Sequence, residues 1–318
     1  MRVIVIGGSG FVGGALVPEL LARGCEVAVI NRGSRHVEHV ENLVADRNDA
    51  AAMAGIARRI DAADAVIDTS CYTGGQAEIA WALLGRRVRR WVHLGSAAVY
   101  ADTTQRPPRE ADPIGGADVW GQYGRDKSEA DAFLLAQDAP GLCILRPPYL
   151  YGPGNDNDRE TFVWSRLLRG RPVVLPSNGT TPLQFLHVAD LGRALTRAAL
   201  EGFPDRVYNI AGGPSVTAEE WVRLLARLVE VPEERAFVHA GSAAGTLQPR
   251  QYFPFRDYPC QVDDERIRAA GWSPSFDLES GFRQTLASIE VRELAQRAIE
   301  TSCEDSILER LGTATSFE

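Results

Sequence analysis

Near its N-terminus the chain reads Val3-Ile4-Val5-Ile6-Gly7-Gly8-Ser9-Gly10-Phe11-Val12-Gly13, an apolar run followed by a glycine-rich turn. The apolar run is typical of a strand buried on both faces of a parallel sheet. Apolar residues at helical spacing continue over 15–23. Gly10 lets backbone approach a pyrophosphate at the helix N-terminus, and Gly13 lets the helix pack closely on the strand. These residues predict a dinucleotide-binding unit; the alternative is a tight turn without a ligand.

Further strands and helices alternate after this unit. Apolar runs at 26–30, 66–68, 91–94 and 142–145 predict strands, and helical patterns lie between them, including 76–84 and 118–137. Such alternation is typical of a parallel sheet with helical crossovers. We therefore predict an α/β protein with a Rossmann-type doubly wound parallel sheet and a smaller C-terminal α/β substrate domain.

The domain boundaries follow from a break in this rhythm after Pro147-Pro148. We assign 1–150, plus about 183–212, to the dinucleotide-binding domain. About 151–182 and 213–287 are expected to form the substrate domain, and 288–318 a helical C-terminal tail.

Composition limits the class of protein. The 318 residues carry a formal charge of −8, which argues against a nucleic-acid partner. Five scattered cysteines form no CxxC pair, so we expect a reduced, cytoplasmic setting and no metal site. No apolar run reaches the length of a membrane span, and the apolar stretch at the N-terminus is too short for a signal peptide.

The end of the second predicted strand bears on cofactor choice. Folds that bind NAD place an acid there to hold the ribose hydroxyls, but this chain has Asn31, followed by Arg32 and Arg35. Two arginines suit a 2′-phosphate, so NADP is favoured over NAD; the alternative is that both are solvated loop charges. Asp46 is expected either to face the adenine or to cap the following helix.

One lysine stands out in the sequence. Of the 34 basic residues only Lys127 is lysine, and it follows Tyr123 by four residues. A predicted helix over 118–137 places the two side chains one turn apart on one face. A compact ammonium fits where the wide fork of arginine does not, so we expect a point charge in a narrow space. The alternative is a solvated pair on the helix surface.

These residues suit redox chemistry on an alcohol. Tyrosine can exchange a proton near neutral pH only if its pKa, ordinarily about 10, is lowered, and a nearby ammonium has that effect. Ser96 follows the strand at 91–94, at the sheet edge where ligands bind, and is expected to hydrogen-bond the substrate oxygen. We therefore predict Ser96, Tyr123 and Lys127 as the catalytic group.

At these residues the chain resembles the short-chain dehydrogenase/reductase family, in its extended, epimerase/dehydratase-like branch. The motifs that carry the resemblance are Gly7-x-x-Gly10-x-x-Gly13, Ser96-Ala97-Ala98-Val99-Tyr100, Tyr123-x-x-x-Lys127, Arg146-Pro147, Tyr151-Gly152-Pro153-Gly154 and Phe185–Asp190. The resemblance implies Tyr123 as general acid/base and Lys127 as the group that holds the nicotinamide ribose. It also implies a homodimer.

The expected binding residues follow from these motifs and strand ends. For the cofactor they are Gly7, Ser9, Gly10, Phe11, Val12, Gly13, Asn31, Arg32, Arg35, Asp46, Thr69, Ser70, Tyr123, Lys127 and Pro147. For a small-molecule substrate they are Cys71, Tyr72, Ala97, Tyr149, Asn155, Arg159, Gln184 and Arg256.

The chain also departs from the family pattern. Nucleotide-sugar members carry Arg-Asp where this chain has Leu183-Gln184. Residues 66–72, with 31–33, resemble a subgroup similar to chloroplast stem-loop-binding proteins. These departures concern the substrate and leave the redox residues intact. The resemblance itself makes a sugar or nucleotide-sugar epimerase or dehydratase our first expectation. The alternatives are an NADPH-dependent reductase of a non-sugar carbonyl and an RNA-binding or regulatory protein on the same fold.

Overall fold

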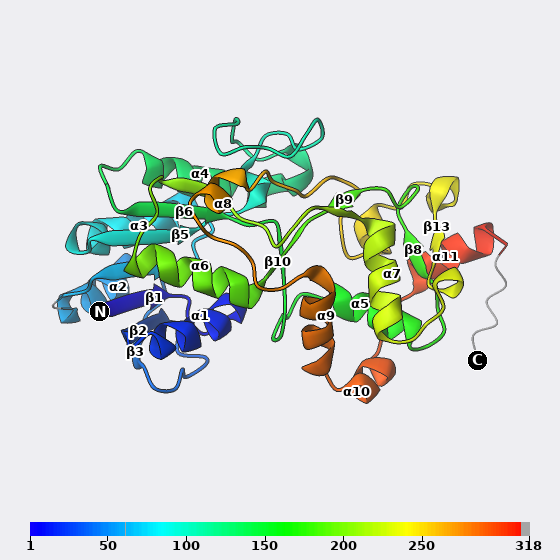
Figure 1. The fold of residues 1–318 in the computed structure, drawn as a ribbon, viewed down its shortest axis with the longest axis horizontal. Helices are drawn as coiled ribbons and strands as arrows, with labels where there is room; N and C mark the ends of the chain where they lie inside the picture. Colours follow the sequence, from blue (N-terminus) through cyan, green and yellow to red (C-terminus); the bar gives the residue numbers. More distant parts are fainter. Residues whose placement is uncertain (61, 313–318) are drawn as a thin grey trace. The chain divides into compact units, whose positions relative to one another are not determined.

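The computed structural model describes residues 1–60 and 62–312, and its contacts divide the chain into two compact units (Figure 1). Unit 1 comprises 1–150, 185–213 and 261–275. Unit 2 comprises 151–184, 214–260 and the chain from 276 onward. The chain therefore passes between the units several times. Among the described residues, no helix combines the length and the apolar character needed to cross a membrane.

Unit 1 is built on a seven-stranded sheet in the order β11-β6-β5-β4-β1-β2-β3. Every pairing in it is parallel. The order from β3 to β6, with its reversal beside β1, is that of a doubly wound dinucleotide-binding sheet. The predicted fold class is thus confirmed. The strands are β1 (Arg2–Ile6), β2 (Glu26–Asn31), β3 (Glu41–Val44), β4 (Ala65–Asp68), β5 (Arg90–Leu94), β6 (Leu142–Arg146) and β11 (Val207–Asn209).

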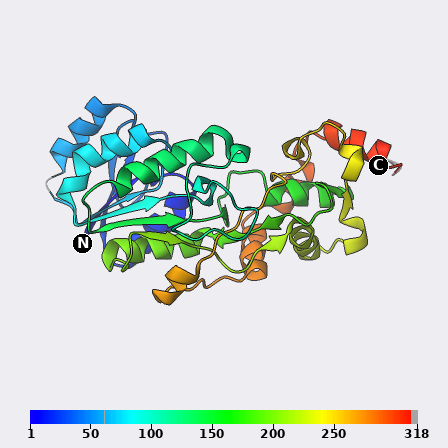
Figure 2. The same ribbon diagram turned by 90° about the horizontal axis from the view of Figure 1, so that it is seen from above.

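Helices cover both faces of this sheet (Figure 2). Alternate residues of β1 enter opposite cores, Val3 and Val5 on one face and Ile4 and Ile6 on the other. This alternation explains why the run is apolar throughout. The first face is covered by α1 (Phe11–Ala22) and α6 (Val188–Leu200), and the second by α2 (Ala50–Arg59), α3 (Gly74–Leu84) and α4 (Gly121–Leu135).

The start of α4 differs from the predicted helix over 118–137. Asp118–Trp120 form a separate 3-10 turn, and Gly121 then adopts a φ of +58°. Only glycine enters this region of backbone conformation at low cost. The regular helix therefore begins at Gly121, two residues before Tyr123.

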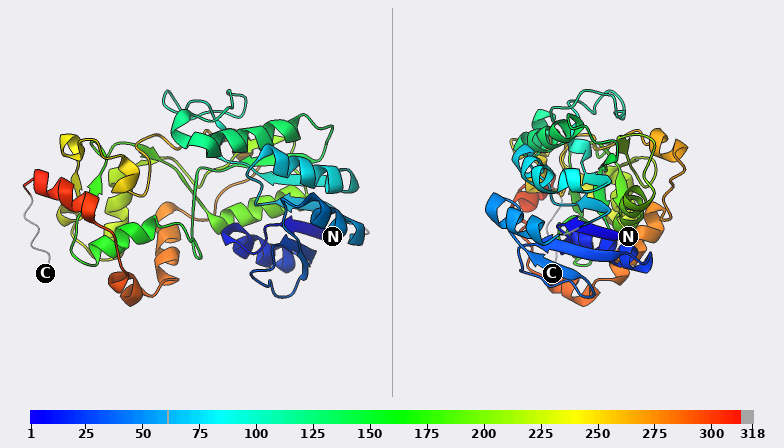
Figure 3. Two further views of the ribbon diagram at one scale, coloured as in Figure 1. Left: turned by 180° about the vertical axis from the view of Figure 1, so that it is seen from behind. Right: turned by 90° about the vertical axis from the view of Figure 1, so that its left-hand side faces the viewer.

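Unit 2 has short strands in small sheets (Figure 3), and aromatic side chains pack together in its core. β8 (Val173–Leu175) pairs in parallel with β13 (Phe237–His239), and β9 (Pro182–Leu183) pairs antiparallel with β12 (Val216–Thr217). On α7 (Ala218–Leu228), the buried Trp221 ring packs edge-on against the ring of Phe255. Unit 2 also contains the helices α5 (Glu160–Leu167) and α9 (Leu278–Ala287). A further two-stranded sheet is formed by β7 (Tyr149–Tyr151) and β10 (Phe185–His187).

The C-terminal segment forms two short helices, α10 (Val291–Gln296) and α11 (Ser302–Arg310). The Arg166 guanidinium of α5 binds the Glu304 carboxylate of α11 at 2.6 Å, and both side chains are buried. The segment after 288 thus contains two helices joined by non-helical residues, and this ion pair anchors it within unit 2. Residues 313–318 of the predicted helical tail 288–318 lie outside the described residues.

Candidate active site

The glycine-rich turn is held in shape by close backbone packing. Gly7 has a φ of +90°, and its amide donates to the Ile30 carbonyl at 3.0 Å. A Cβ on Gly13 would lie 2.2 Å from the Gly8 carbonyl oxygen, whereas a Cβ on Gly10 would meet only the Gly7 oxygen at 3.9 Å. Helix α1 follows Gly10 with no side-chain cap and no acid in its first turn. Its first amides are thus left for an anion, which fits a dinucleotide pyrophosphate.

The loop after β4 closes one side of this turn. A Cβ added to Gly7 would lie 2.5 Å from the Ser70 side chain. The Thr69 hydroxyl and amide both donate to the Ile6 carbonyl at 3.0 Å. The predicted cofactor residues Thr69 and Ser70 are therefore adjacent to the glycine turn.

A buried ion pair that the sequence analysis missed supports the same loop. Arg47 donates to both carboxylate oxygens of Asp68, at 2.6 and 2.8 Å, and to the Ser70 hydroxyl at 3.1 Å. Both charged side chains are buried. Asp68 ends an apolar strand, and a buried carboxylate there requires a cation. The need of Asp68 for a cationic partner was thus the feature of the sequence that could have indicated Arg47.

The loop after β2 presents arginines. The Asn31 side chain accepts from the Gly33 amide at 2.8 Å and donates to the Arg35 carbonyl at 3.4 Å, so it shapes the loop itself. Arg32 and Arg35 are exposed, and neither guanidinium has a hydrogen-bond or ion-pair partner among residues 1–60 and 62–312.

Asp46 does not cap α2, so one of the two expectations for it is wrong. Its Oδ1 accepts from the Asn48 amide at 2.8 Å, within the loop. The N-cap of α2 is Asp49, which accepts from the Ala51 and Ala52 amides. Asp46 itself is exposed beside the end of β3.

Tyr123 and Lys127 lie one turn apart on α4 in contrasting surroundings. The Tyr123 side chain is 45% exposed, whereas Lys127 is 3% exposed. The Lys127 ammonium donates to the carbonyls of Leu94 at 2.5 Å and Cys71 at 2.7 Å. It therefore lies between the ends of β4 and β5, in a space that admits one compact cation.

Ser96 lies beside the same helix. Its hydroxyl accepts from the Ala98 amide at 3.2 Å and caps a 3-10 turn, Ala97–Val99. A Cβ on Gly124 would lie 2.8 Å from the Ala98 carbonyl, so the glycine after Tyr123 permits α4 to contact this turn. The Ala97 amide donates to Pro147 at 2.8 Å. A backbone hydrogen bond thus connects the turn capped by Ser96 to Pro147, which brings together three of the predicted residues, Ser96, Ala97 and Pro147.

A buried polar network lies behind Lys127. One Asp131 oxygen accepts from Arg146 at 2.8 Å, and the other lies 3.2 Å from the His93 ring. All three side chains are at most 1% exposed. Burial lowers the pKa of the Lys127 ammonium, and the Asp131 carboxylate is the leading influence that opposes this fall.

The predicted substrate residues of unit 1 differ in exposure. Tyr72 is 54% exposed, while Cys71 is 1% exposed and donates to the Thr73 carbonyl. Burial raises the pKa of the Cys71 thiol to about 12, so the thiol is neutral near neutral pH. Ala97 is buried, and Tyr149 packs edge-on against Trp120.

The other predicted substrate residues belong to unit 2. Asn155 donates to the buried Glu160 carboxyl at 3.0 Å, a partner that the sequence analysis did not anticipate. The Arg159 guanidinium lies over the Phe255 ring. Gln184 is buried, and its backbone amide donates to the Cys260 carbonyl. Arg256 is partly exposed.

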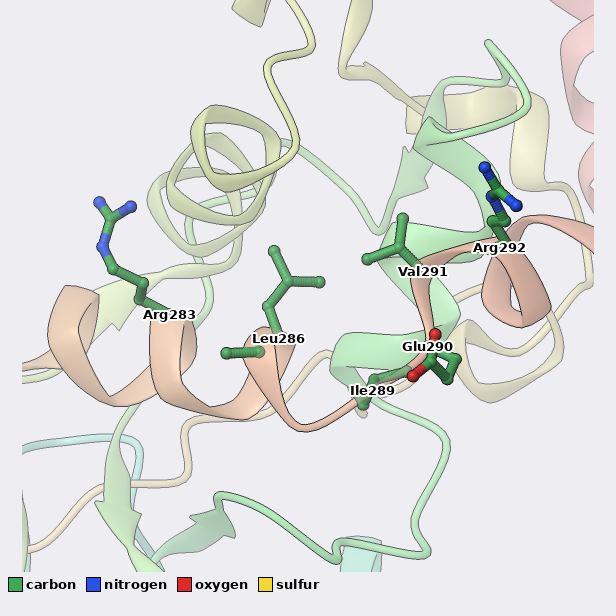
Figure 4. Close-up of a pocket in the computed structure, with 7 residues that line it drawn as sticks. Arg283, Leu286, Ile289, Glu290, Val291 and Arg292 are labelled. Atoms are coloured by element: carbon green, nitrogen blue, oxygen red, sulfur yellow. The ribbon is translucent and has the colours of Figure 1, made fainter.

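A hollow of about 570 Å³ opens in unit 2 between the end of α9 and the start of α10 (Figure 4). Arg283 and Arg292 lie at its two ends, with Leu286 and Val291 between them. None of the predicted site residues lines it. The hollow is therefore not part of the candidate active site.

Comparison with known proteins places this geometry in context. The model of the NAD dependent epimerase/dehydratase family matches residues 3–211. The chain is 26% identical over 329 residues to the chloroplast stem-loop binding protein of 41 kDa b of Arabidopsis thaliana, covering 97% of this chain and 84% of that protein. It is 28% identical over 305 residues to a 3-diazoavenalumate denitrifying reductase of Streptomyces, covering 86% and 96% of the two chains.

A solved structure shows the same fold. The NAD complex of dTDP-glucose 4,6-dehydratase from Bacillus anthracis superposes with a TM-score of 0.75 at 17% identity. The match covers 92% of this chain and 97% of that one.

Proposed function

Because the chain belongs to the NAD dependent epimerase/dehydratase family, as its motifs predicted, we propose that it epimerises or dehydrates a sugar or a sugar nucleotide. The proposed route is transient oxidation of a carbinol. The observation that carries the proposal is Lys127: the only lysine of the chain is buried one turn after an exposed tyrosine, at the ends of two parallel strands.

Tyr123 is the proposed acid/base. Its exposure lets a substrate hydroxyl reach the phenol, and the Lys127 ammonium favours the phenolate that accepts the carbinol proton. The Ser96 hydroxyl holds the substrate oxygen in place. The same phenol returns the proton when the carbonyl is reduced.

The dinucleotide is held by the glycine turn and the α1 N-terminus, with Thr69 and Ser70 beside it. When bound, its nicotinamide supplies the hydride acceptor and donor for the reaction. In this proposal the Lys127 ammonium, held by two carbonyls at the ends of neighbouring strands, contacts the nicotinamide ribose.

NADP remains our preferred cofactor within this NAD-dependent family. Asn31 stands where an acid would select NAD, and its side chain is engaged within the loop. The exposed Arg32 and Arg35 lack partners among the described residues and suit a 2′-phosphate. We also propose a cytoplasmic homodimer, which sedimentation analysis of the purified protein would test.

The experiment is mass spectrometry of small molecules released from the purified protein. We expect a bound dinucleotide together with a sugar or sugar nucleotide, and turnover that needs no added cofactor. Release of neither molecule, and no dinucleotide binding on titration, would contradict the proposal.

A reductase is the second candidate, favoured by the similarity to a denitrifying reductase. A reductase consumes NADPH stoichiometrically with product, whereas an epimerase or dehydratase regenerates its cofactor. Cofactor balance during turnover therefore separates the two.

RNA binding is the third candidate, suggested by the similarity to a stem-loop binding protein. Two of the arginines in 86–90 already bind backbone carbonyls of this chain. Arg87 donates to the Ala57 carbonyl, and Arg90 donates to the Glu201 carbonyl. These contacts lie at helix C-termini, where cations are favourable. Salt-dependent RNA affinity in a binding assay would favour this candidate.

A further inference from the structure

The buried groups around Lys127 are unequal in charge. The groups that face or adjoin its ammonium are Asp68 at the end of β4, Cys71 and Tyr72 in the loop after β4, His93 on β5, Tyr123 and Asp131 on α4, Arg146 on β6 and Arg47 in the β3–α2 loop. Burial lowers the pKa of His93, with Lys127 as a second cause, so the ring is neutral near pH 7. Burial raises the pKa of Cys71 to about 12, so the thiol is also neutral.

The cations in this group outnumber the carboxylates. Arg47 is paired with Asp68 at 2.6 Å, and Arg146 with Asp131 at 2.8 Å. Among residues 1–60 and 62–312, the Lys127 ammonium has two backbone carbonyls and no carboxylate as hydrogen-bond acceptors. The buried cluster therefore carries one positive charge in excess, on the residue adjacent to the proposed acid/base.

Resting on the proposed function, we infer that Asp131 is a positioning residue that keeps Lys127 charged. Asp131 follows Lys127 by one helical turn. Arg146 of β6 donates a hydrogen bond to one of its carboxylate oxygens, and the His93 ring of β5 lies 3.2 Å from the other. Without this carboxylate, the cluster would hold two uncompensated charges out of water, which is costly. Lys127 would relieve that cost by losing its proton. When the Asp131 carboxylate is present, the cluster keeps one excess positive charge. The negative charge of a Tyr123 phenolate neutralises it, so this excess charge favours the phenolate.

The same cluster does not suit a metal cation. Donor atoms of Asp68, Cys71 and His93 lie within 4.8 Å of one another. However, Arg47 occupies both Asp68 oxygens, and the Lys127 ammonium lies beside the Cys71 carbonyl. A second cation there would meet uncompensated positive charge.

The single lysine makes a direct test feasible. Protein made with lysine labelled by carbon-13 at Cε gives one side-chain signal, and its pH titration reports the pKa of Lys127. We expect Asp131→Asn to lower that midpoint by about 1 to 3 pH units, and Arg146→Gln, which leaves the carboxylate without its arginine, to raise it. The opposite signs separate an electrostatic role from structural damage.

Two further variants complete the test. Asp190→Asn removes a buried carboxylate on α6, on the opposite face of the sheet, and should leave the Lys127 midpoint unchanged. If Asp131→Asn does not fold, the double variant Asp131→Asn with Arg146→Gln keeps the net charge and should titrate like the natural protein. Midpoints that stay fixed in the single variants, or that move in the double variant, would overturn the inference.

A failure of this inference and a failure of the proposed function give different results. Failure of the inference leaves the Lys127 midpoint insensitive to Asp131 while Tyr123→Phe still abolishes turnover. Failure of the proposed function leaves turnover intact in Tyr123→Phe, whatever the Lys127 titration shows.

Discussion

At the scale of single residues, the surroundings of Lys127 distinguish a lysine ammonium from an arginine guanidinium. The residue is 3% exposed, and its ammonium lies between two carbonyl oxygens at 2.5 and 2.7 Å. A guanidinium is wider and cannot take this place. We expect Lys127→Arg to lower kcat by about 10²-fold or more, as measured by steady-state kinetics.

A matched control lies on the same helix. Arg125→Lys makes the converse exchange at an exposed position and should leave kcat unchanged. Near-normal kinetics in Lys127→Arg would show that the identity of the buried cation does not matter.

Residue identity was informative where chemistry requires one residue type. Tyr123 and Lys127 were predicted from their four-residue spacing and from the single lysine of the chain, and Ser96 from its place after a strand. An acid/base, a point charge and a hydroxyl have few substitutes. Arg47, His93 and Asp131 were not recognised, since they come from loops, strands and helices that only the folded sheet brings together.

At the scale of elements, the glycine turn and α1 depend on a close approach that leaves no room for a side chain. A Cβ on Gly13 would lie 2.2 Å from the Gly8 oxygen, so the turn must move. We expect Gly13→Ala to destabilise the protein by about 1–3 kcal/mol and to weaken dinucleotide binding. Thermal unfolding and cofactor titration measure both effects.

The next residue provides the opposite case. A Cβ on Gly14 meets nothing within 4 Å, so Gly14→Ala should stabilise the helix by about 0.5–1 kcal/mol. Equal effects from the two substitutions would contradict the packing explanation.

The loop after β2 bears on cofactor choice. Replacing both Arg32 and Arg35 by alanine should weaken NADP binding by about tenfold or more, because each can donate a charge-assisted hydrogen bond to a 2′-phosphate. NAD affinity should be unchanged, and so should both affinities in the control Arg86→Ala. Equal loss of NAD and NADP affinity would exclude this role.

Elements were predictable where periodicity was strong. The strand β1 and helix α1 follow from an apolar run and a helical pattern. The start of α4 was misplaced because a helical pattern does not reveal that Gly121, with its positive φ, separates the 3-10 turn Asp118–Trp120 from the regular helix.

At the scale of the whole molecule, the C-terminal helix α11 contributes to unit 2 through one buried ion pair. Removing one partner of such a pair leaves an uncompensated charge, at a cost of about 3–5 kcal/mol. We therefore expect Glu304→Ala to lower the unfolding temperature and to speed hydrogen exchange in α5 and α11. The control Glu309→Ala removes an exposed carboxylate from the same helix and should change neither. An unchanged unfolding temperature in Glu304→Ala would show that α11 is not held by this pair.

The architecture of unit 1 was predictable because most of its strands and helices carry their own pattern; the bounds of β3 and α2 were not predicted. That of unit 2 was less so, since its strands are two or three residues long and its core is made of scattered aromatic residues. The charged sequence of the C-terminal segment likewise gave no sign that Glu304 would be buried.

Turnover of Tyr123→Phe tests the account most directly. Reduced nicotinamide and product would be followed with the substrate that co-purifies, or with a panel of sugar nucleotides, in the natural protein and in the variant. The phenol is 45% exposed, so the substitution should leave the fold and the cofactor affinity nearly unchanged. We predict that turnover falls by about 10²–10⁴-fold; turnover close to that of the natural protein would contradict the assignment of Tyr123 as the acid/base.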